Sequence, residues 1–87
     1  MTQNTFNGWY NYHTWNVSLF ILNEYPLYKL ACDWVQHQLD MEAPVDYDIF
    51  RHTLTELWGA VTPDGVSWSD PTLDTDELSE MLQELVC

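Results

Sequence analysis

The first 23 residues of the chain contain no aspartate, glutamate, lysine or arginine, whereas the remainder is strongly acidic. The sequence holds 14 acidic side chains but only two basic ones, Lys29 and Arg51, which gives a net charge of −12. Few carboxylates can therefore be paired, so most must face water, where they repel one another. We expect the uncharged N-terminal segment to supply the core and the later helices and loops to carry the charge.

Length and composition predict one folded domain. A chain of 87 residues is near the lower size at which a protein folds alone, and a hydrophobic fraction of 46% is too high for a disordered chain. We expect a single acidic helical domain over residues 1–87, with a polar lead-in over residues 1–8. The N-terminus lacks the pattern of a signal peptide, and no apolar stretch is long enough to cross a bilayer. Cys32 and Cys87 are therefore expected to be free thiols in a reducing cytoplasm.

Two helices are predicted in the first half of the chain. Asn11 is a suitable N-cap for a helix that begins at Tyr12. This helix should end near residues 23–25, because Pro26 disfavours helical geometry in the residue before it and suits the first position of a second helix. The predicted apolar faces are Trp15, Leu19, Phe20, Ile21 and Leu22 in the first helix, and Leu27, Leu30, Ala31 and Trp34 in the second.

Two further helices are predicted in the second half. Asp46 suits the N-cap of a third helix over roughly residues 47–59, and Gly59 suits its end. A long loop follows over about residues 60–73, and Asp74 with Glu77 then forms a capping box for a last helix. The predicted apolar faces are Tyr47, Phe50, Leu54, Leu57 and Trp58, and then Leu78, Met81, Leu82 and Leu85. The sequence therefore predicts an all-α domain of four short helices with one long loop.

The pattern of reactive side chains does not favour an enzyme. No CxxC, HxxxH or HExxH spacing occurs, and the three glycines are too isolated to form a phosphate-binding loop. A Cys32–His37 pair would still need a third orienting group and an oxyanion site. The residues that remain as alternatives for a zinc site are His13, Cys32, His37, His52 and Cys87. We expect a non-enzymatic protein without a metal or a cofactor.

Aromatic residues have two interpretations here. Trp9, Tyr10, Tyr12 and Trp15 resemble a stacking platform for single-stranded nucleic acid, but such platforms lie in positive grooves and this chain lacks the cations for one. We therefore expect these rings to pack into the core. Trp68, in the loop, is either a lid over the core or an exposed anchor for a partner.

The acidic surface predicts a basic protein as partner and argues against direct binding of nucleic acid or membrane. Duplex DNA presents regularly spaced negative charge, and proteins that read it do so with lysine and arginine. Carboxylates on rigid helices can present a similar array to the same basic groove. The alternative is a solvated acidic face, as in a halophilic protein. The predicted partner-binding residues are Asp40, Glu42, Asp46, Asp48, Asp64, Trp68, Asp70, Asp74, Asp76, Glu77, Glu80 and Glu84.

One segment, residues 7–23, reads NGWYNYHTWNVSLFILN and resembles a family of small proteins from phages and other mobile elements, with the signature NGW-x-NYxTWNVxLxxxN. The matching residues are Asn7, Gly8, Trp9, Asn11, Tyr12, Thr14, Trp15, Asn16, Val17, Leu19 and Asn23. The resemblance implies a viral or mobile-element origin, and hence the cytoplasm of a host cell. In size and charge the chain is also similar to anti-restriction and anti-CRISPR proteins.

These observations lead to a hypothesis of inhibition by mimicry. We expect a phage-encoded inhibitor that binds the basic groove of a host CRISPR or restriction complex as an acidic imitation of nucleic acid. The alternative is a small adaptor that binds a host protein through an aromatic or apolar patch. The sequence leaves the oligomeric state and the identity of the target open.

Overall fold

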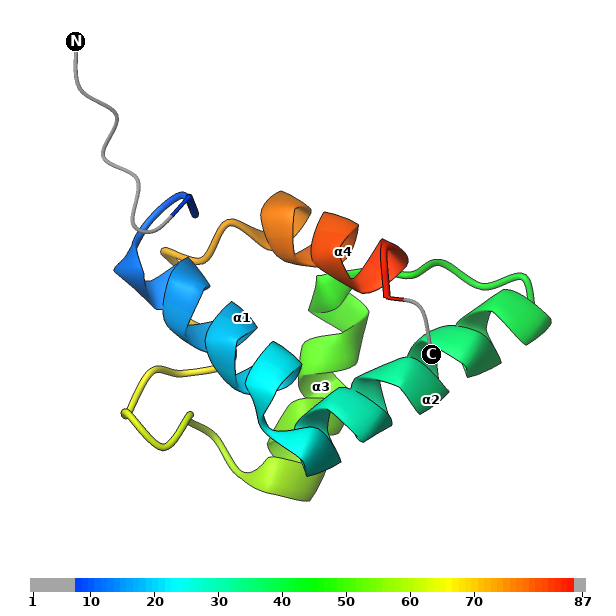
Figure 1. Cartoon of the computed structure of the whole chain (residues 1–87), viewed down its shortest axis with the longest axis horizontal. Coiled ribbons are helices and arrows are strands. Elements are labelled where there is room, and N and C mark those ends of the chain that lie inside the picture. Colours follow the sequence, from blue (N-terminus) through cyan, green and yellow to red (C-terminus); the bar gives the residue numbers. More distant parts are fainter. Residues whose placement is uncertain (1–7, 86–87) are drawn as a thin grey trace, which may run out of the picture.

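The computed structural model describes residues 8–85, which form a small all-α domain (Figure 1). Its four helices are α1 (Tyr12–Asn23), α2 (Tyr25–Asp40), α3 (Tyr47–Trp58) and α4 (Thr75–Gln83). The predicted fold class and the order of the helices are confirmed. Most of the predicted polar lead-in, residues 1–7, lies outside the described residues.

The helix starts follow local capping chemistry. The Oδ1 atom of Asn11 accepts the backbone N–H of Thr14 at 2.8 Å, and Asp46 accepts the backbone N–H of Asp48 at 2.7 Å, as the sequence predicted for α1 and α3. In α2, Pro26 is the second residue rather than the first, because the helix already begins at Tyr25. Proline has no backbone N–H, and none is needed at either position, since the N–H groups of the first turn have no carbonyl partner within the helix.

The C-terminal helix α4 packs against each of the other three helices. It contacts α1, α2 and α3, while α1 and α2 follow one another across a bend at Glu24 (Figure 1). The core is one apolar cluster to which all four helices and the loop contribute. Its buried members are Val17, Ile21, Leu27, Ala31, Val35, Tyr47, Phe50, Leu54, Val66, Trp68, Leu73, Leu78, Met81 and Leu82.

The predicted face of α1 is only partly correct, because Ile21 is fully buried and Phe20 packs against the core but the other three predicted residues are not buried. Its buried residues are Thr14, Asn16, Val17, Ser18 and Ile21, whereas Trp15 and Leu19 are half-buried and Leu22 is 38% exposed. The N-terminal segment therefore supplies only a small share of the apolar core. Hydrophobic periodicity could not resolve the orientation, because α1 has no charged residue to mark its outer face.

The apolar faces of the other helices agree better with the predictions. In α2 and α4 the predicted stripes are buried or pack against the core, although Leu85 comes after the end of α4. In α3, however, Leu57 is 64% exposed and Trp58 is 43% exposed, so the predicted apolar face is too long. These two residues come in the last turn of α3, beyond the buried Leu54.

The loop from residue 59 to residue 74 is attached to α1 by buried hydrogen bonds. Asn16 is fully buried; its Nδ2 donates to Asp64 Oδ2 at 2.8 Å, and its Oδ1 accepts from Thr62 Oγ1 at 2.8 Å. Thr62 Oγ1 in turn accepts the backbone N–H groups of Asp64 and Val66. A buried polar group is costly unless it is bonded, so this network fixes the turn around Asp64 on α1.

We predict that Asn16→Ala destabilises the protein by about 2 kcal/mol, because it leaves the buried Thr62 hydroxyl without its acceptor. Asn23→Ala is the matched control, since Asn23 also lies in α1 but makes only an exposed bond to the carbonyl of Leu19. The control should cost about 0.5 kcal/mol or less. Urea unfolding followed by circular dichroism measures both, and equal losses would contradict the role of the network.

Candidate functional site

Both basic side chains are already engaged by acids on their own helices. Lys29 Nζ lies 3.1 Å from Asp33 Oδ1, and an Arg51 guanidinium nitrogen lies 3.1 Å from Asp48 Oδ1. Exposed pairs of this kind add little stability. They nevertheless occupy the chain's only lysine and arginine, so 14 − 2 = 12 carboxylates have no such partner, and all of them lie within residues 8–85.

Many of the predicted partner-binding acids also have a local role in the fold. Asp46 and Asp74 cap helices, Asp48 pairs with Arg51, and Asp40 accepts from Gln36. The others with such a role are Asp64, Asp70 and Glu77, which accept hydrogen bonds from Asn16, Thr72 and Tyr10. The presence of these acids therefore has a structural explanation that requires no partner.

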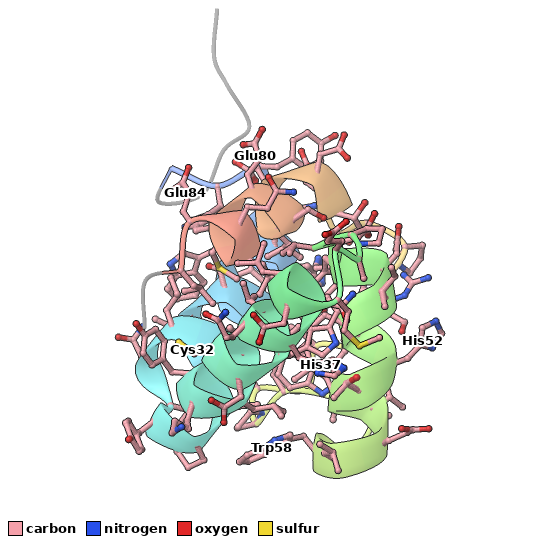
Figure 2. All side chains as sticks on the ribbon, turned by 90° about the vertical axis from the view of Figure 1, so that its right-hand side faces the viewer. Cys32, His37, His52, Trp58, Glu80 and Glu84 are labelled. Carbon is pink, nitrogen blue, oxygen red and sulfur yellow. The ribbon has the colours of Figure 1, made fainter. Side chains whose placement is uncertain are left out.

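Four predicted acids make no such bond. Glu42, Asp76, Glu80 and Glu84 are exposed, and their side chains make no hydrogen bond or ion pair with the residues the structure describes. Glu80 and Glu84 lie together on α4 and at its C-cap (Figure 2). Negative charge at a helix C-terminus opposes the helix dipole, so these two glutamates are not explained by helix stability.

The prediction that Trp68 binds a partner is wrong, because Trp68 is a core residue. It is only 1% exposed, and its carbonyl accepts the Tyr47 hydroxyl at 2.7 Å. A buried ring cannot contact a partner directly, so the alternative of a lid over the core applies. The expectation of core packing is in turn wrong for Tyr10 and Tyr12, which are 57% and 41% exposed.

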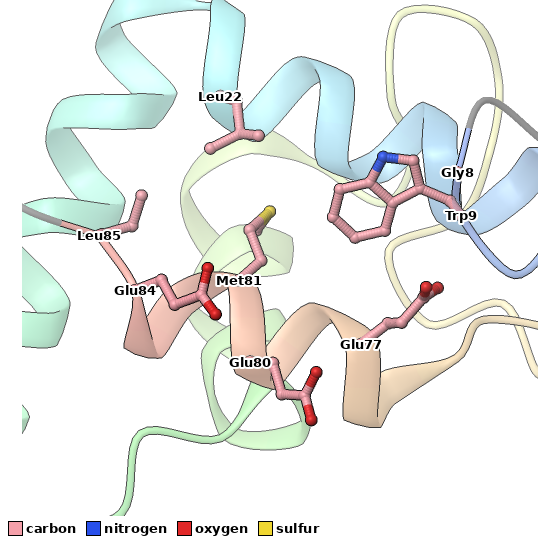
Figure 3. Close-up of a pocket in the computed structure, with 8 residues that line it drawn as sticks. All are labelled: Gly8, Trp9, Leu22, Glu77, Glu80, Met81, Glu84 and Leu85. Carbon is pink, nitrogen blue, oxygen red and sulfur yellow. The ribbon is translucent and has the colours of Figure 1, made fainter.

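A groove of about 420 Å³ lies between the last turn of α1 and α4, and sequence reasoning did not predict it. Its apolar lining comes from Trp9, Leu22, Met81 and Leu85, and its acidic lining from Glu77, Glu80 and Glu84, with Gly8 at one end. Figure 3 shows Trp9, Leu22 and Leu85 arranged around Met81, which points from α4 into the groove. Glu80 points away from these apolar groups and stands on the outer edge.

One end of the groove is held by hydrogen bonds. Glu77 accepts the backbone N–H of Tyr10 at 2.8 Å, which places the segment before α1 against α4. The backbone N–H of Asp74 donates to Thr14 Oγ1 at 3.0 Å. The predicted capping box is therefore only half formed: Asp74 caps the N–H of Glu77, but the Glu77 side chain binds Tyr10 instead of reaching back to Asp74.

The sequence candidates for catalysis and zinc are not brought together. Cys32 is buried and disulfide-bonded, so the expectation of a free thiol is wrong, while Cys87 lies outside the described residues. Cys32, His37 and His52 do not converge on one point (Figure 2). Within residues 8–85, no group of three or more histidine, cysteine, aspartate or glutamate side chains is placed to hold a metal ion. Over the same range, no helix has the length and apolar character needed to cross a bilayer.

The chain belongs to a family of unknown function (DUF7249), whose model matches residues 2–87. No curated protein and no solved structure matches the chain. Family membership therefore assigns no activity, and the chemistry of the site rests on the acidic surface and the groove.

Asp70 offers a pH-dependent test of the loop before α4. The hydroxyl and backbone N–H of Thr72 donate to its carboxylate, and with a smaller contribution from His13 they hold the pKa of Asp70 below its ordinary value. A lowered pKa in the folded state adds stability above the unfolded pKa, and that stability is lost as the pH falls through the folded pKa.

We predict that Thr72→Val, which removes the hydroxyl but keeps the backbone N–H, raises the pKa of Asp70 toward its ordinary value. Its destabilising effect should be present at neutral pH and absent at pH values below both pKa values. NMR titration of the Asp70 carboxyl carbon measures the shift, and Thr53→Val on α3 is the control. An unchanged Asp70 titration in Thr72→Val would contradict the assignment.

Proposed function

We propose that this protein is a phage- or mobile-element-encoded inhibitor of a host nucleic-acid-binding defence complex of the CRISPR or restriction type. It acts stoichiometrically, as an acidic mimic that occupies the basic groove of its target. The observation that carries the proposal is the set of 12 carboxylates without a lysine or arginine partner. The resemblance of residues 7–23 to proteins of mobile elements supplies the expected biological setting.

The placement of the acids supports mimicry over a merely solvated surface. Seven acids lie between residues 64 and 84, on the last loop and α4. Several are fixed by hydrogen bonds, as Asp74 is at the start of α4 and Asp64 is by Asn16. Fixed carboxylates lose little conformational freedom on binding, so a basic partner gains more from each contact. The charge field also accelerates the encounter with a positive groove.

The alternative function is an adaptor that binds a host protein through an apolar patch. The apolar lining of the groove, with Leu22 exposed in it, is the observation that favours this alternative. Salt separates the two functions, because screening weakens a contact between exposed charges but leaves an apolar contact nearly unchanged.

We predict that the charge reversal Asp76→Lys/Glu80→Lys/Glu84→Lys lowers protection of phage by about tenfold or more, because it turns an attractive surface into a repulsive one. The assay is phage plaquing on a host that carries the defence system and expresses the protein. The three positions make no side-chain bond with the described residues, so the fold should tolerate the change. Asp76→Lys carries a small cost, because it opposes the dipole in the first turn of α4, and a circular dichroism melt measures that cost.

The control reverses two acids that are exposed and outside the predicted set, Glu24 in the bend between α1 and α2 and Glu56 on α3, which changes the net charge by +4 compared with +6 in the α4 variant. The control should retain most of the protection. Full protection by the α4 variant would end the mimicry proposal. Protection by wild type on a host without the defence system would also contradict it.

A further inference from the structure

We infer that the groove between α1 and α4 is the docking site for a basic amphipathic helix of a partner protein. Apolar side chains of that helix enter between Trp9, Leu22 and Met81, and its lysine or arginine side chains contact the glutamates of α4. This goes beyond the proposed function, because mimicry requires only a negative field. It shares with that function one premise, that the partner is basic.

The floor of the groove is suited to an apolar anchor. Trp9 and Leu85 are partly buried and pack against the core, and Met81 is only 8% exposed, so the floor is supported from beneath. Leu22 is 38% exposed on the α1 side, and covering it removes further apolar surface from water. A volume of about 420 Å³ lies within the range of ordinary binding pockets.

The acidic edge is suited to a helix. Glu77, Glu80 and Glu84 occupy positions i, i+3 and i+7 of α4 and its C-cap, so their spacing follows the helical repeat of about 5.4 Å. A second helix laid along the groove repeats at the same interval, which lets successive cations face the exposed Glu80 and Glu84, while Glu77 already binds the backbone N–H of Tyr10. A cation near Glu84 would also complement the dipole of α4, which has no basic residue in its last turn.

Charge complementarity selects a basic polypeptide among the possible occupants. A second copy of this chain carries a net charge of −12, and its Lys29 and Arg51 are already ion-paired. Nucleic acid and anionic membrane are repelled by the same glutamates. A helix in a groove is also a common mode of peptide recognition, in which one apolar face provides the anchors. An arginine of the partner can in addition stack on the exposed part of the Trp9 ring.

The probe for this site is a fluorescently labelled peptide of about 14 residues, or roughly four helical turns. It carries leucines on one face and lysines on both flanks, with blocked ends. The matched peptide has the same composition, with its leucines spread around the helix. Fluorescence anisotropy with the full chain should give binding about tenfold tighter for the amphipathic peptide, because only that peptide can bury its leucines together.

Three variants test whether the peptide binds in the groove. Leu22→Ser should weaken the amphipathic peptide about tenfold, since it removes apolar area from the floor. Glu80→Gln/Glu84→Gln should weaken it about fivefold through lost ion pairs. The control Glu24→Gln/Glu56→Gln removes the same charge elsewhere and should leave the affinity nearly unchanged. Should Leu22→Ser fail to fold, the two glutamine pairs still decide the question.

Three results would overturn the inference. One is equal affinity of the two peptides, and another is an equal loss of affinity in the two double glutamine variants. Either result would assign the binding to the overall negative charge of the protein. The third is concentration-dependent dimerisation in sedimentation that Leu22→Ser abolishes, which assigns the groove to a second copy. If any of these results is obtained while phage protection still depends on the α4 acids, the proposed function stays intact. Groove-specific peptide binding without phage protection would instead reject the proposed function and leave the docking site intact.

Discussion

Hydrogen bonds between α1 and the segment that leads into α4 hold this domain together, because its core is small and its surface repels itself. Thr14 and Asn16 are fully buried, and their side chains bind Asp74, Thr62 and Asp64, more than 40 residues later in the chain. These bonds position the loop, and the loop brings Trp68 into the core. They also set the start of α4 beside α1, which leaves the groove open at the other end of the two helices.

The acidic residues fall into two groups, those that accept hydrogen bonds within the described part of the fold and those that do not. Asp46, Asp64 and Asp74 accept hydrogen bonds from backbone or side-chain amide N–H groups, and these donors partly compensate the negative charge of the three carboxylates. The repulsion that remains lowers the stability of the compact state. Glu80 and Glu84 add to that repulsion and receive no compensating bond from the described residues. The acids of the chain are therefore not equivalent: the first group presents fixed charge and also serves the fold, whereas the second group has no bond within the described residues that explains it.

Much of the fold could be predicted because its signals are local. Asn11, Asp46 and Asp74 each cap a helix within three residues of their own position, and Gly59 ends α3 with a φ of 92°. The orientation of α1, the burial of Trp68 and the groove depend instead on contacts between distant segments. The single sequence contains no periodic signal for these contacts, since Thr14, Asn16 and Ser18 read as surface residues until their partners are known.

Glu77 illustrates how a correct local signal can conceal a tertiary role. Its position three residues after Asp74 predicts a capping box, yet its carboxylate binds the backbone N–H of Tyr10 at 2.8 Å. The backbone N–H of Asp74 becomes available to Thr14 as a result, and both bonds draw the start of α1 toward α4. The same exchange places Trp9 beside Met81 in the groove. One glutamate thus connects the capping of α4, the attachment of the N-terminal segment and the shape of the surface that is offered to a partner.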